Sequence, residues 1–477
     1  MPFSSSPIKN DSPRPILLWL VAIGFFMQTL DTTIVNTALP AMAKSLGESP
    51  LRMQSVVVAY SLTMAMLIPA SGWIADRFGT RRVFFSAIVL FAIGSLLCAF
   101  SQSLTQLVAS RVVQGMGGAL LLPVGRLAVL RAFPREKFLV AMSFVAIPGL
   151  IGPLLGPTLG GWLVEVASWH WIFLINVPVA LLGCIATVIH MPAGRSEAVM
   201  RFDLNGYLLL AFGMVAISLS LDGLSDLGLR QATVLVLLMF GLASLTAYWL
   251  HAARRPDPLF SPRLFSIPTV TIGLLGNLFA RIGCSCMPFL IPLLLQVSLA
   301  YSPLQAGLMM VPVAVAGIFS KRLATKLITW AGYRMVLVVN TALVGLIMAS
   351  FALMSPGQPV WLRIVQLACF GAINSLQFTA MNTIALKDLD GDLASSGNSL
   401  LSMVQMLAMS MGVAAASAVL AAFTGYFASA GALQTLQAFH ATFATMGLIT
   451  VASAWIFWQL SPDIQPTGGQ HDPVDTR

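Results

Sequence analysis

Long apolar segments recur through the whole chain, and they constrain its fold more than any other feature. A helix that crosses a bilayer needs about 20 mostly apolar residues. We find fourteen segments near that length, at 16–38, 54–75, 83–101, 107–130, 138–162, 169–190, 204–222, 231–250, 269–297, 304–326, 335–354, 360–386, 394–424 and 439–460. Backbone polar groups must be satisfied internally in lipid, so each segment is expected to be helical. The sequence therefore predicts an all-α polytopic membrane protein with fourteen transmembrane helices.

Composition supports a membrane protein and argues against several other classes. Only 9% of the 477 residues are charged and 57% are hydrophobic, whereas a soluble domain carries about 25% charged residues. The first apolar segment exceeds the roughly 7–15 residues of a signal-peptide core, so we expect it to remain as the first helix. The five cysteines fall inside predicted helices, where they pack as small apolar side chains. Because no metal-ligand cluster, nucleotide-binding motif or catalytic triad is visible, we expect no metal, no cofactor and no enzyme.

Basic residues gather on one side of the predicted membrane. With the N-terminus in the cytoplasm, seventeen of the 26 Lys and Arg residues fall in cytoplasmic segments and four fall in outer loops. Cytoplasmic loops of membrane proteins carry such an excess. The sequence thus predicts that both termini are cytoplasmic, and the net charge of +9 requires no nucleic-acid partner. The expected partners are the lipid bilayer, a small-molecule substrate and a proton, and we expect a monomer.

Two polar linkers divide the chain into blocks. They predict an N-terminal six-helix bundle over 1–190, two extra helices with their cytoplasmic linkers over 191–268, a C-terminal six-helix bundle over 269–460, and a disordered cytoplasmic tail over 461–477. Weak internal symmetry agrees with this division, since Gly79-Thr80-Arg81 in the first block matches Gly332-Tyr333-Arg334 in the last. Paired repeats with a binding site near the membrane midplane are the usual plan of secondary transporters.

A loop rich in glycine and arginine joins the second and third segments. It reads Gly72-Trp73-Ile74-Ala75-Asp76-Arg77-Phe78-Gly79-Thr80-Arg81-Arg82. The glycines would allow a tight turn and a close approach of helices. The acid is placed to pair with an arginine or to cap the start of a helix.

The fifth segment carries glycines at intervals of three, four and four residues. These are Gly149, Gly152, Gly156 and Gly160, which share one face of a helix. Small residues on one face let a second helix approach closely. The prolines at 148, 153 and 157 are expected to add kinks.

Asp31 is the one acid that we place inside the membrane core. A charge there costs about 2.5–3.5 kcal/mol on insertion scales, so it needs a partner. Arg111 is expected at a similar depth, and the two charges can offset each other's desolvation. Burial favours the protonated acid and Arg111 favours the charged one, so this pair is our candidate for proton coupling. A purely structural ion pair remains an alternative.

Four ordered stretches resemble signatures of the major facilitator superfamily. They are the loop 72–82, the segment 107–119 with Arg111-Val112-Val113-Gln114-Gly115, the glycine and proline pattern of 149–163, and the stretch 30–40 taken with the run 169–178. Together with the fourteen segments, they resemble the fourteen-span drug–proton antiporter branch of that family.

The resemblance implies two six-helix bundles plus two extra central helices, which export small molecules across the inner membrane by alternating access. Proton entry would supply the energy, without a cofactor. The resemblance also implies a cytoplasmic gate that includes Gly72, Asp76, Arg77, Gly79 and Arg81. It further implies that Gly152, Pro153, Gly156, Pro157 and Gly160 form a seam that keeps the cavity closed to ions, although generic glycine packing explains the same pattern.

Polar residues inside the predicted helices are candidates to line the substrate cavity. They are Gln28, Arg126, Arg281, Asn374 and Gln377. Lys321 and Arg322 lie nearer a helix end, where long basic side chains can snorkel towards water. Several cations and one acid in the membrane core leave an alternative to multidrug efflux, which is an exporter of anionic metabolites or metal chelates with the same fold.

Overall fold

The computed structural model describes residues 15–133, 135–192, 202–225, 231–389, 392–428 and 434–462, and all its regular elements there are helices. The first half contains α1 (Pro15–Leu46), η1 (Pro50–Met53), α2 (Gln54–Phe78), α3 (Thr80–Ala99), α4 (Leu104–Ala132), α5 (Arg135–Val166), α6 (Trp171–Leu174) and α7 (Asn176–His190). Then follow α8 (Leu204–Ser225), α9 (Gln231–Arg254) and η2 (Pro262–Ser266). The second half contains α10 (Pro268–Ser285), α11 (Met287–Val297), α12 (Pro303–Met309), α13 (Val311–Ser350), η3 (Phe351–Leu353), α14 (Val360–Leu386), α15 (Asp392–Tyr426) and α16 (Gln434–Trp458).

These helices confirm the predicted fold class. Within the described residues, 13 helical stretches are long and apolar enough to cross a membrane, and α5 is a further helix of 32 residues that continues through its three prolines. Helix α13 covers two predicted segments, 304–326 and 335–354, and its backbone leaves the helical conformation between them, at Gly332 (φ 74°, ψ 163°). Gly79 has a similar positive φ, 89°, between α2 and α3. The symmetry between the two glycine turns is therefore real in the backbone.

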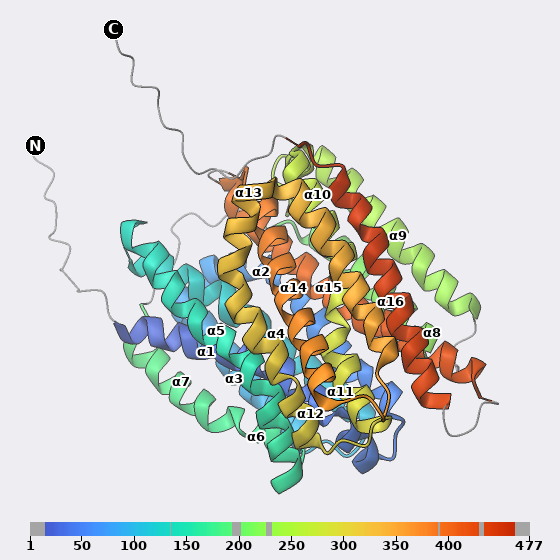
Figure 1. Ribbon diagram of the computed structural model, residues 1–477. Helices are drawn as coiled ribbons and strands as arrows, with labels where there is room; N and C mark the ends of the chain where they lie inside the picture. The colour runs from blue at the N-terminus through green and yellow to red at the C-terminus, as the bar shows by residue number, and fades with distance from the viewer. Residues whose placement is uncertain are drawn as a thin grey trace, which may run out of the picture.

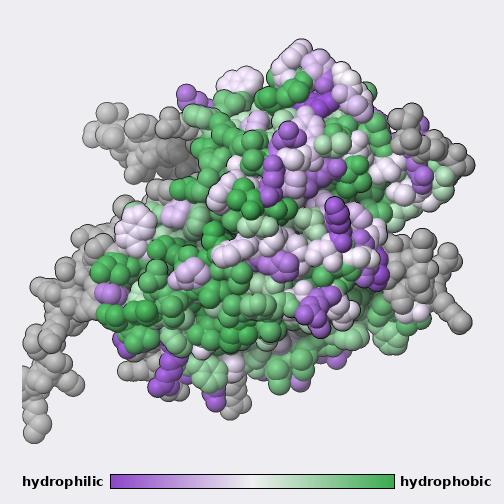
Figure 2. Space-filling view, turned by 90° about the horizontal axis from the view of Figure 1, so that it is seen from below, coloured by the Kyte–Doolittle hydropathy of each residue, from purple (hydrophilic) through white to green (hydrophobic). Residues whose placement is uncertain are grey.

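Large apolar side chains cover much of the outer surface. Trp330 is 84% exposed, Phe319 75% and Trp455 70%. Figure 2 shows broad hydrophobic areas on one face, with smaller groups of hydrophilic side chains between them. Soluble monomers rarely expose such large apolar areas, so this surface belongs in contact with lipid.

The two six-helix halves lie side by side, with α8 and α9 at the edge of the second half (Figure 1). Helix α8 packs against α15, where the hydroxyl oxygens of Ser218 and Ser410 are 2.9 Å apart. Helix α9 packs on α8 and η2. The linker stretch 193–201 and most of the predicted tail, 463–477, lie outside the described residues.

The two ends of the bundle differ. We call the end with the turns at Gly79 and Gly332 the basic end, and the end with loops 47–53, 100–103 and 298–302 the sealed end. At the sealed end, α5 of the first half packs directly on α12 of the second. A Cβ on Gly161 would lie 2.2 Å from the carbonyl oxygen of Pro303, so only glycine fits there. The Glu165 carboxylate accepts a hydrogen bond from Ser302 Oγ at 2.9 Å. These contacts hold the two halves together at this end.

Candidate functional site

A large cavity of about 1630 Å³ lies between the two halves. It is lined from both sides, by α1, α2, α4 and α5 of the first half and by α10, α13, α14 and α15 of the second. Its lining reaches the basic end at Asp76 and at the linker 257–260. Since the halves are in contact at the sealed end, the protein stands in a conformation that is open towards the basic end.

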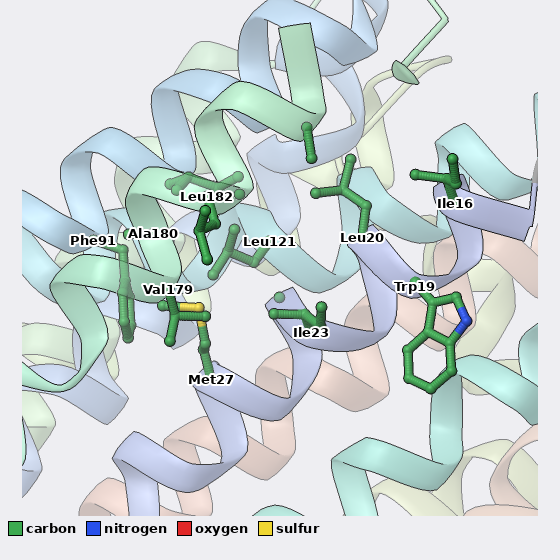
Figure 3. A pocket seen from close by; sticks show the side chains of 14 residues that line it. Ile16, Trp19, Leu20, Ile23, Met27, Phe91, Leu121, Val179, Ala180 and Leu182 are labelled. Carbon is green, nitrogen blue, oxygen red and sulfur yellow. The ribbon is translucent and has the colours of Figure 1, made fainter. Parts of the chain in front are cut away.

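A second, smaller hollow of about 190 Å³ lies between α1, α3, α4 and α7. Figure 3 shows apolar side chains around it, among them Ile23, Leu121 and Leu182. Trp19 contributes the indole nitrogen that is visible there, and its side chain is 54% exposed. This hollow offers no charged group to a ligand, so the central cavity is the better candidate site.

Asp31 and Arg111 form the predicted ion pair. Arg111 Nη1 donates to Asp31 Oδ2 at 2.6 Å, and the two side chains are 1% and 0% exposed. Arg111 Nε also donates to the carbonyl oxygen of Val56 at 3.2 Å. The guanidinium carbon lies 4.1 Å from the centre of the Tyr60 ring. The prediction that these two residues pair is confirmed, and a role in proton coupling stays a prediction.

Three neutral residues complete this network. Gln114 Nε2 donates to Asp31 Oδ1 at 2.8 Å, and its Oε1 accepts from Arg111 Nη1 at 2.6 Å. Asn176 Nδ2 reaches Asp31 Oδ1 at 3.3 Å, and Ser95 Oγ accepts from Gln114 at 2.9 Å. The buried charge is thus tied to α3, α4 and α7. We did not predict these partners, although Gln114 stands three residues after Arg111 and so shares its helix face.

The Asp31 carboxylate does not itself line the cavity. Its neighbours on α1, Gln28 and Thr32, do. Gln28 Oε1 is buried and has no hydrogen-bond partner among the described residues. Helix α1 therefore carries both the buried acid and part of the cavity wall, and a rotation of α1 would change the distance between the ion pair and the cavity.

The glycine seam of α5 holds α1 in place. A Cβ on Gly152 would lie 2.3 Å from Thr29 Oγ1, on Gly156 2.1 Å from Thr33 Oγ1, and on Gly160 2.6 Å from the Ile34 carbonyl oxygen. The predicted close approach is confirmed, and its partner is the helix that carries Asp31. Pro153 lines the cavity, and Pro157 takes part in the seal, since its carbonyl oxygen would be 2.2 Å from a Cβ on Gly307 of α12.

The 72–82 loop makes its predicted ion pair across the basic end. Asp76 pairs with Arg131 at the end of α4. Arg81 Nε donates to the Met191 carbonyl oxygen at 2.5 Å, which fixes the start of α3 to the end of α7. Arg77 lies over the Trp73 ring, 5.7 Å from its centre.

The two glycines of this loop have different outcomes. Gly79 takes a φ that suits glycine, which confirms the predicted tight turn. The predicted close helix approach is wrong for Gly72, because a Cβ there would meet nothing within 4 Å. Gly72 lines the open cavity instead.

Four of the five predicted cavity residues line the cavity, namely Gln28, Arg126, Arg281 and Asn374. Gln377 does not, so its prediction is wrong. It is 1% exposed and donates to Thr341 Oγ1 at 2.6 Å while it accepts from Asn340 at 2.8 Å. Sequence alone could not tell which face of α14 meets the cavity. Lys321 lines the cavity as well, while the side chain of Arg322 lies outside the described residues.

A charge cluster that we did not predict stands at the mouth of the cavity. Asp203, 2% exposed, accepts from His251 Nε2 at 2.9 Å and from the backbone of Gly206 and Leu259. Arg255 Nη1 lies 3.5 Å away. Burial raises the pKa of Asp203, but these hydrogen bonds outweigh it and hold the pKa below the ordinary value. The cluster anchors the linker 257–260 beside the cavity.

Two helical bundles with internal symmetry around a central cavity are the usual plan of secondary transporters, and this protein has that plan. The family model of the Major Facilitator Superfamily matches residues 21–413. The chain belongs to the major facilitator superfamily, and it is a multi-pass membrane protein.

Bacterial relatives cover nearly the whole chain. MdtD of Serratia proteamaculans strain 568, named as a candidate multidrug resistance protein, is 51% identical over 96% of this chain and 95% of its own length. The MdtD protein of Pectobacterium carotovorum strain PC1 is 50% identical over 94% and 96%.

Solved structures share the fold at low sequence identity. A POT family transporter in complex with 5-aminolevulinic acid aligns with a TM-score of 0.69 at 16% identity, over 96% of this chain and 98% of that chain. A D-xylose–proton symporter aligns with a TM-score of 0.66 at 15% identity, over 95% and 98%.

Proposed function

We propose that this protein exports small molecules of the multidrug type across the inner membrane of a bacterium, driven by proton entry. The relatives named for multidrug resistance support this function, and the family supports proton coupling. We further propose that the basic end faces the cytoplasm, that the protein works as a monomer, and that it is neither an enzyme nor dependent on a cofactor.

The observation that carries the proposal is the buried Asp31–Arg111 pair beside the cavity wall. A buried charge pair is costly to maintain for stability alone, since apolar residues often replace such pairs without loss. A proton that enters from outside would neutralise Asp31 and weaken its bond to Arg111. Because α1 carries both Asp31 and the cavity-lining Gln28 and Thr32, that change would reach the substrate site directly.

Alternating access then requires the two ends to exchange their roles. The α5–α12 contacts at Gly161 and Gly307 must separate, and the basic end must close. The Asp76–Arg131 pair joins α2 to α4 within the first half, so it keeps this half rigid while the halves rock. The glycine seam between α1 and α5 transmits a shift of α1 to the sealed end, because α1 contacts α11 and α5 contacts α12 of the second half.

The test uses inside-out vesicles with an acidic interior and acridine orange as the reporter of the pH gradient. Addition of an exported compound from a panel of neutral, cationic and anionic probes releases protons, which restores the fluorescence. We expect the natural protein to respond to at least one probe and Asp31→Asn to respond to none. Glu48→Gln removes an acid from an exposed pair with Arg52 at the sealed end and should respond normally. A full response from Asp31→Asn would exclude the coupling role.

A further inference from the structure

The cations that line the cavity lie deeper than the acids that line it. Three cations line it, Arg126 from α4, Arg281 from α10 and Lys321 from α13. Three acids line it too, Asp76, Asp203 and Asp257, but all stand at the basic end. Asp76 pairs with Arg131 and Asp203 with His251 and Arg255, and Asp257 is an exposed linker residue.

Arg281 is the deepest of the three cations. It stands thirteen residues after the first residue of α10, Pro268, which corresponds to about 20 Å along the helix axis. In a hydrocarbon core about 30 Å thick, that depth is beyond the reach of a snorkelling side chain from the basic end. Its guanidinium carbon lies 4.4 Å from the centre of the Phe378 ring. In the part of the chain that the structure describes, no acid lies within salt-bridge distance of it.

The other two cations add positive charge on both sides of the cavity, Arg126 from the first half and Lys321 from the second. Arg126 stands six residues before the end of α4 at Ala132, about 9 Å from that end. Its Nε is buried and has no hydrogen-bond partner among the described residues. Lys321 stands eleven residues before the turn at Gly332, about 16 Å from it. Low-dielectric walls concentrate the potential of such charges inside a cleft and attract ions of the opposite sign.

The remaining wall suits an apolar or aromatic body. Met381 of α14 and Met406 and Met409 of α15 line the cavity together with Phe378. Methionine side chains adapt to varied apolar shapes. Asn374 and Gln405 on the same helices can donate hydrogen bonds. A ligand that satisfies the whole cavity therefore combines an anionic group with an apolar body.

We infer that the central cavity binds amphipathic organic anions, with the carboxylate on Arg281 and the apolar body against the methionines of α14 and α15. A guanidinium binds a carboxylate through two parallel hydrogen bonds, which gives both strength and orientation. A cationic substrate has no equivalent partner deep in the cavity, since Asp31 is occupied by Arg111 and does not line it, and Asp257 stands at the basic end. This inference rests on the proposed export function, and it specifies the charge of what is exported.

Binding at equilibrium tests the inference without any transport. Protein in phosphatidylcholine nanodiscs is dialysed against three ring-matched probes, 1-naphthoate, 1-naphthamide and 1-naphthylmethylammonium, with empty nanodiscs as the blank. We expect naphthoate to bind at least tenfold more tightly than the amide, and the amine to bind most weakly. Equal or tighter binding of the amine would overturn the inference.

Variants then locate the anion site. Arg281→Gln should abolish the preference for naphthoate over naphthamide, and Arg281→Lys should keep part of it because the charge remains. The matched control is Arg334→Gln, which also removes a cation over an aromatic ring, 4.6 Å from the centre of Trp458, but outside the cavity lining; it should keep the full preference. An unchanged preference in Arg281→Gln would overturn the assignment.

Two further variants protect this test against misfolding. If Arg281→Gln does not yield folded protein, Arg126→Gln and Lys321→Gln should each reduce the preference severalfold, and no reduction in either would count against the inference. Nanodiscs carry no proton gradient, so a failure here leaves proton-driven export standing. A failed acridine orange test, with the naphthoate preference intact, would instead count against the proposed function.

Discussion

Two arginines inside the membrane-spanning helices, Arg111 in the first half and Arg281 in the second, are held in opposite ways. Arg111 of the first half meets the Asp31 carboxylate at 2.6 Å and a backbone carbonyl oxygen at 3.2 Å, and it is 1% exposed. Arg281 of the second half lies over Phe378 and faces the cavity, with no ion-pair partner among the described residues. Arg111 is therefore paired within its own bundle, while the guanidinium of Arg281 is open to water or a ligand in the cavity.

In our proposal, this difference gives Asp31 and Arg281 separate tasks. The first half contains the acid that a proton can neutralise. In the second half, α13 and α14 are joined by a neutral network, in which Asn340 donates to Gln377 and Gln377 donates to Thr341. Neither of those bonds depends on a proton. The proposed proton binding at Asp31 and the proposed anion binding at Arg281 therefore use different residues, and each can be changed without the other.

The largest expected effect concerns the membrane potential. If one proton enters for each monovalent anion that leaves, two positive charges move inward per cycle. Each charge contributes about 2.3 kcal/mol per 100 mV, so the two contribute about 4.6 kcal/mol. Export of a monovalent cation for one proton would move no net charge. The anion site thus predicts transport that depends steeply on the potential.

This dependence can be measured in inside-out vesicles that are strongly buffered at one pH on both sides. Valinomycin and external potassium set an interior-positive potential, and accumulation of radiolabelled 1-naphthoate is followed. We expect a potential of about 100 mV to raise the accumulation ratio by about 10³-fold. Accumulation that does not change with the membrane potential would contradict the arrangement in which Asp31 is paired with Arg111 and Arg281 is open to an anion in the cavity.

The second effect concerns stability. Removal of one member of a buried pair leaves an uncompensated charge and costs about 3–5 kcal/mol. We therefore expect Arg111→Gln to lower the free energy of unfolding by about that amount, whereas Arg281→Gln, which breaks no pair, changes it by less than about 1 kcal/mol. Unfolding of both variants in mixed detergent micelles gives the comparison.

A double variant separates charge from packing at the same site. Asp31→Asn/Arg111→Gln removes both charges, so it should recover more than half of the stability that Arg111→Gln loses. Equal losses in Arg111→Gln and Arg281→Gln would mean that the two arginines are held alike after all.

Much of the charged pair could be predicted from the sequence, because depth along a helix follows from residue counting. Asp31 and Arg111 come at comparable distances from the same predicted membrane surface. The orienting partners Gln114 and Asn176 were not predicted, since their roles depend on how α4 and α7 rotate about their axes. Packing between helices sets that rotation, and an apolar helix that is surrounded by lipid and protein shows no clear polar face to reveal it.

The same limit explains the errors at the cavity. Gln377 is as polar as Asn374 and three residues away, yet it faces α13 and not the cavity. Gly72 was expected to permit a close contact that a conformation open at the basic end does not make. The cluster around Asp203 was missed because a carboxylate in a polar linker gives no signal until the fold buries it.

A third effect tests how the closed pair is positioned. Gly156→Ala would place a Cβ 2.1 Å from Thr33 Oγ1 on α1, and we expect a loss of about 1–3 kcal/mol from overpacking. Gly72→Ala is the matched control. Its Cβ meets nothing within 4 Å, so the better helix propensity of alanine should stabilise by about 0.5–1 kcal/mol. If both variants unfold at the same denaturant concentration, the seam does not hold α1.

The smallest expected effect concerns Asp203, an acid outside the Asp31–Arg111 pair. Asp203 is buried like Asp31 but is bonded to groups at the basic end. Its pKa is held below the ordinary 3.8, so its stabilising contribution is present above that pH and is lost as the pH falls through the lower folded value. Asp203→Asn deprives the Leu259 N–H of a charged acceptor, and it should cost about 1–2 kcal/mol at pH 7. The difference from the natural protein should shrink below pH 3.8, because Asp203 is then increasingly protonated in both the folded and the unfolded chain.

Asp257→Asn, at an exposed site in the same linker, should cost less than about 0.5 kcal/mol at either pH. A cost for Asp203→Asn that stays constant with pH would contradict this prediction, because it would show that the shape of the side chain and not its charge anchors the linker 257–260.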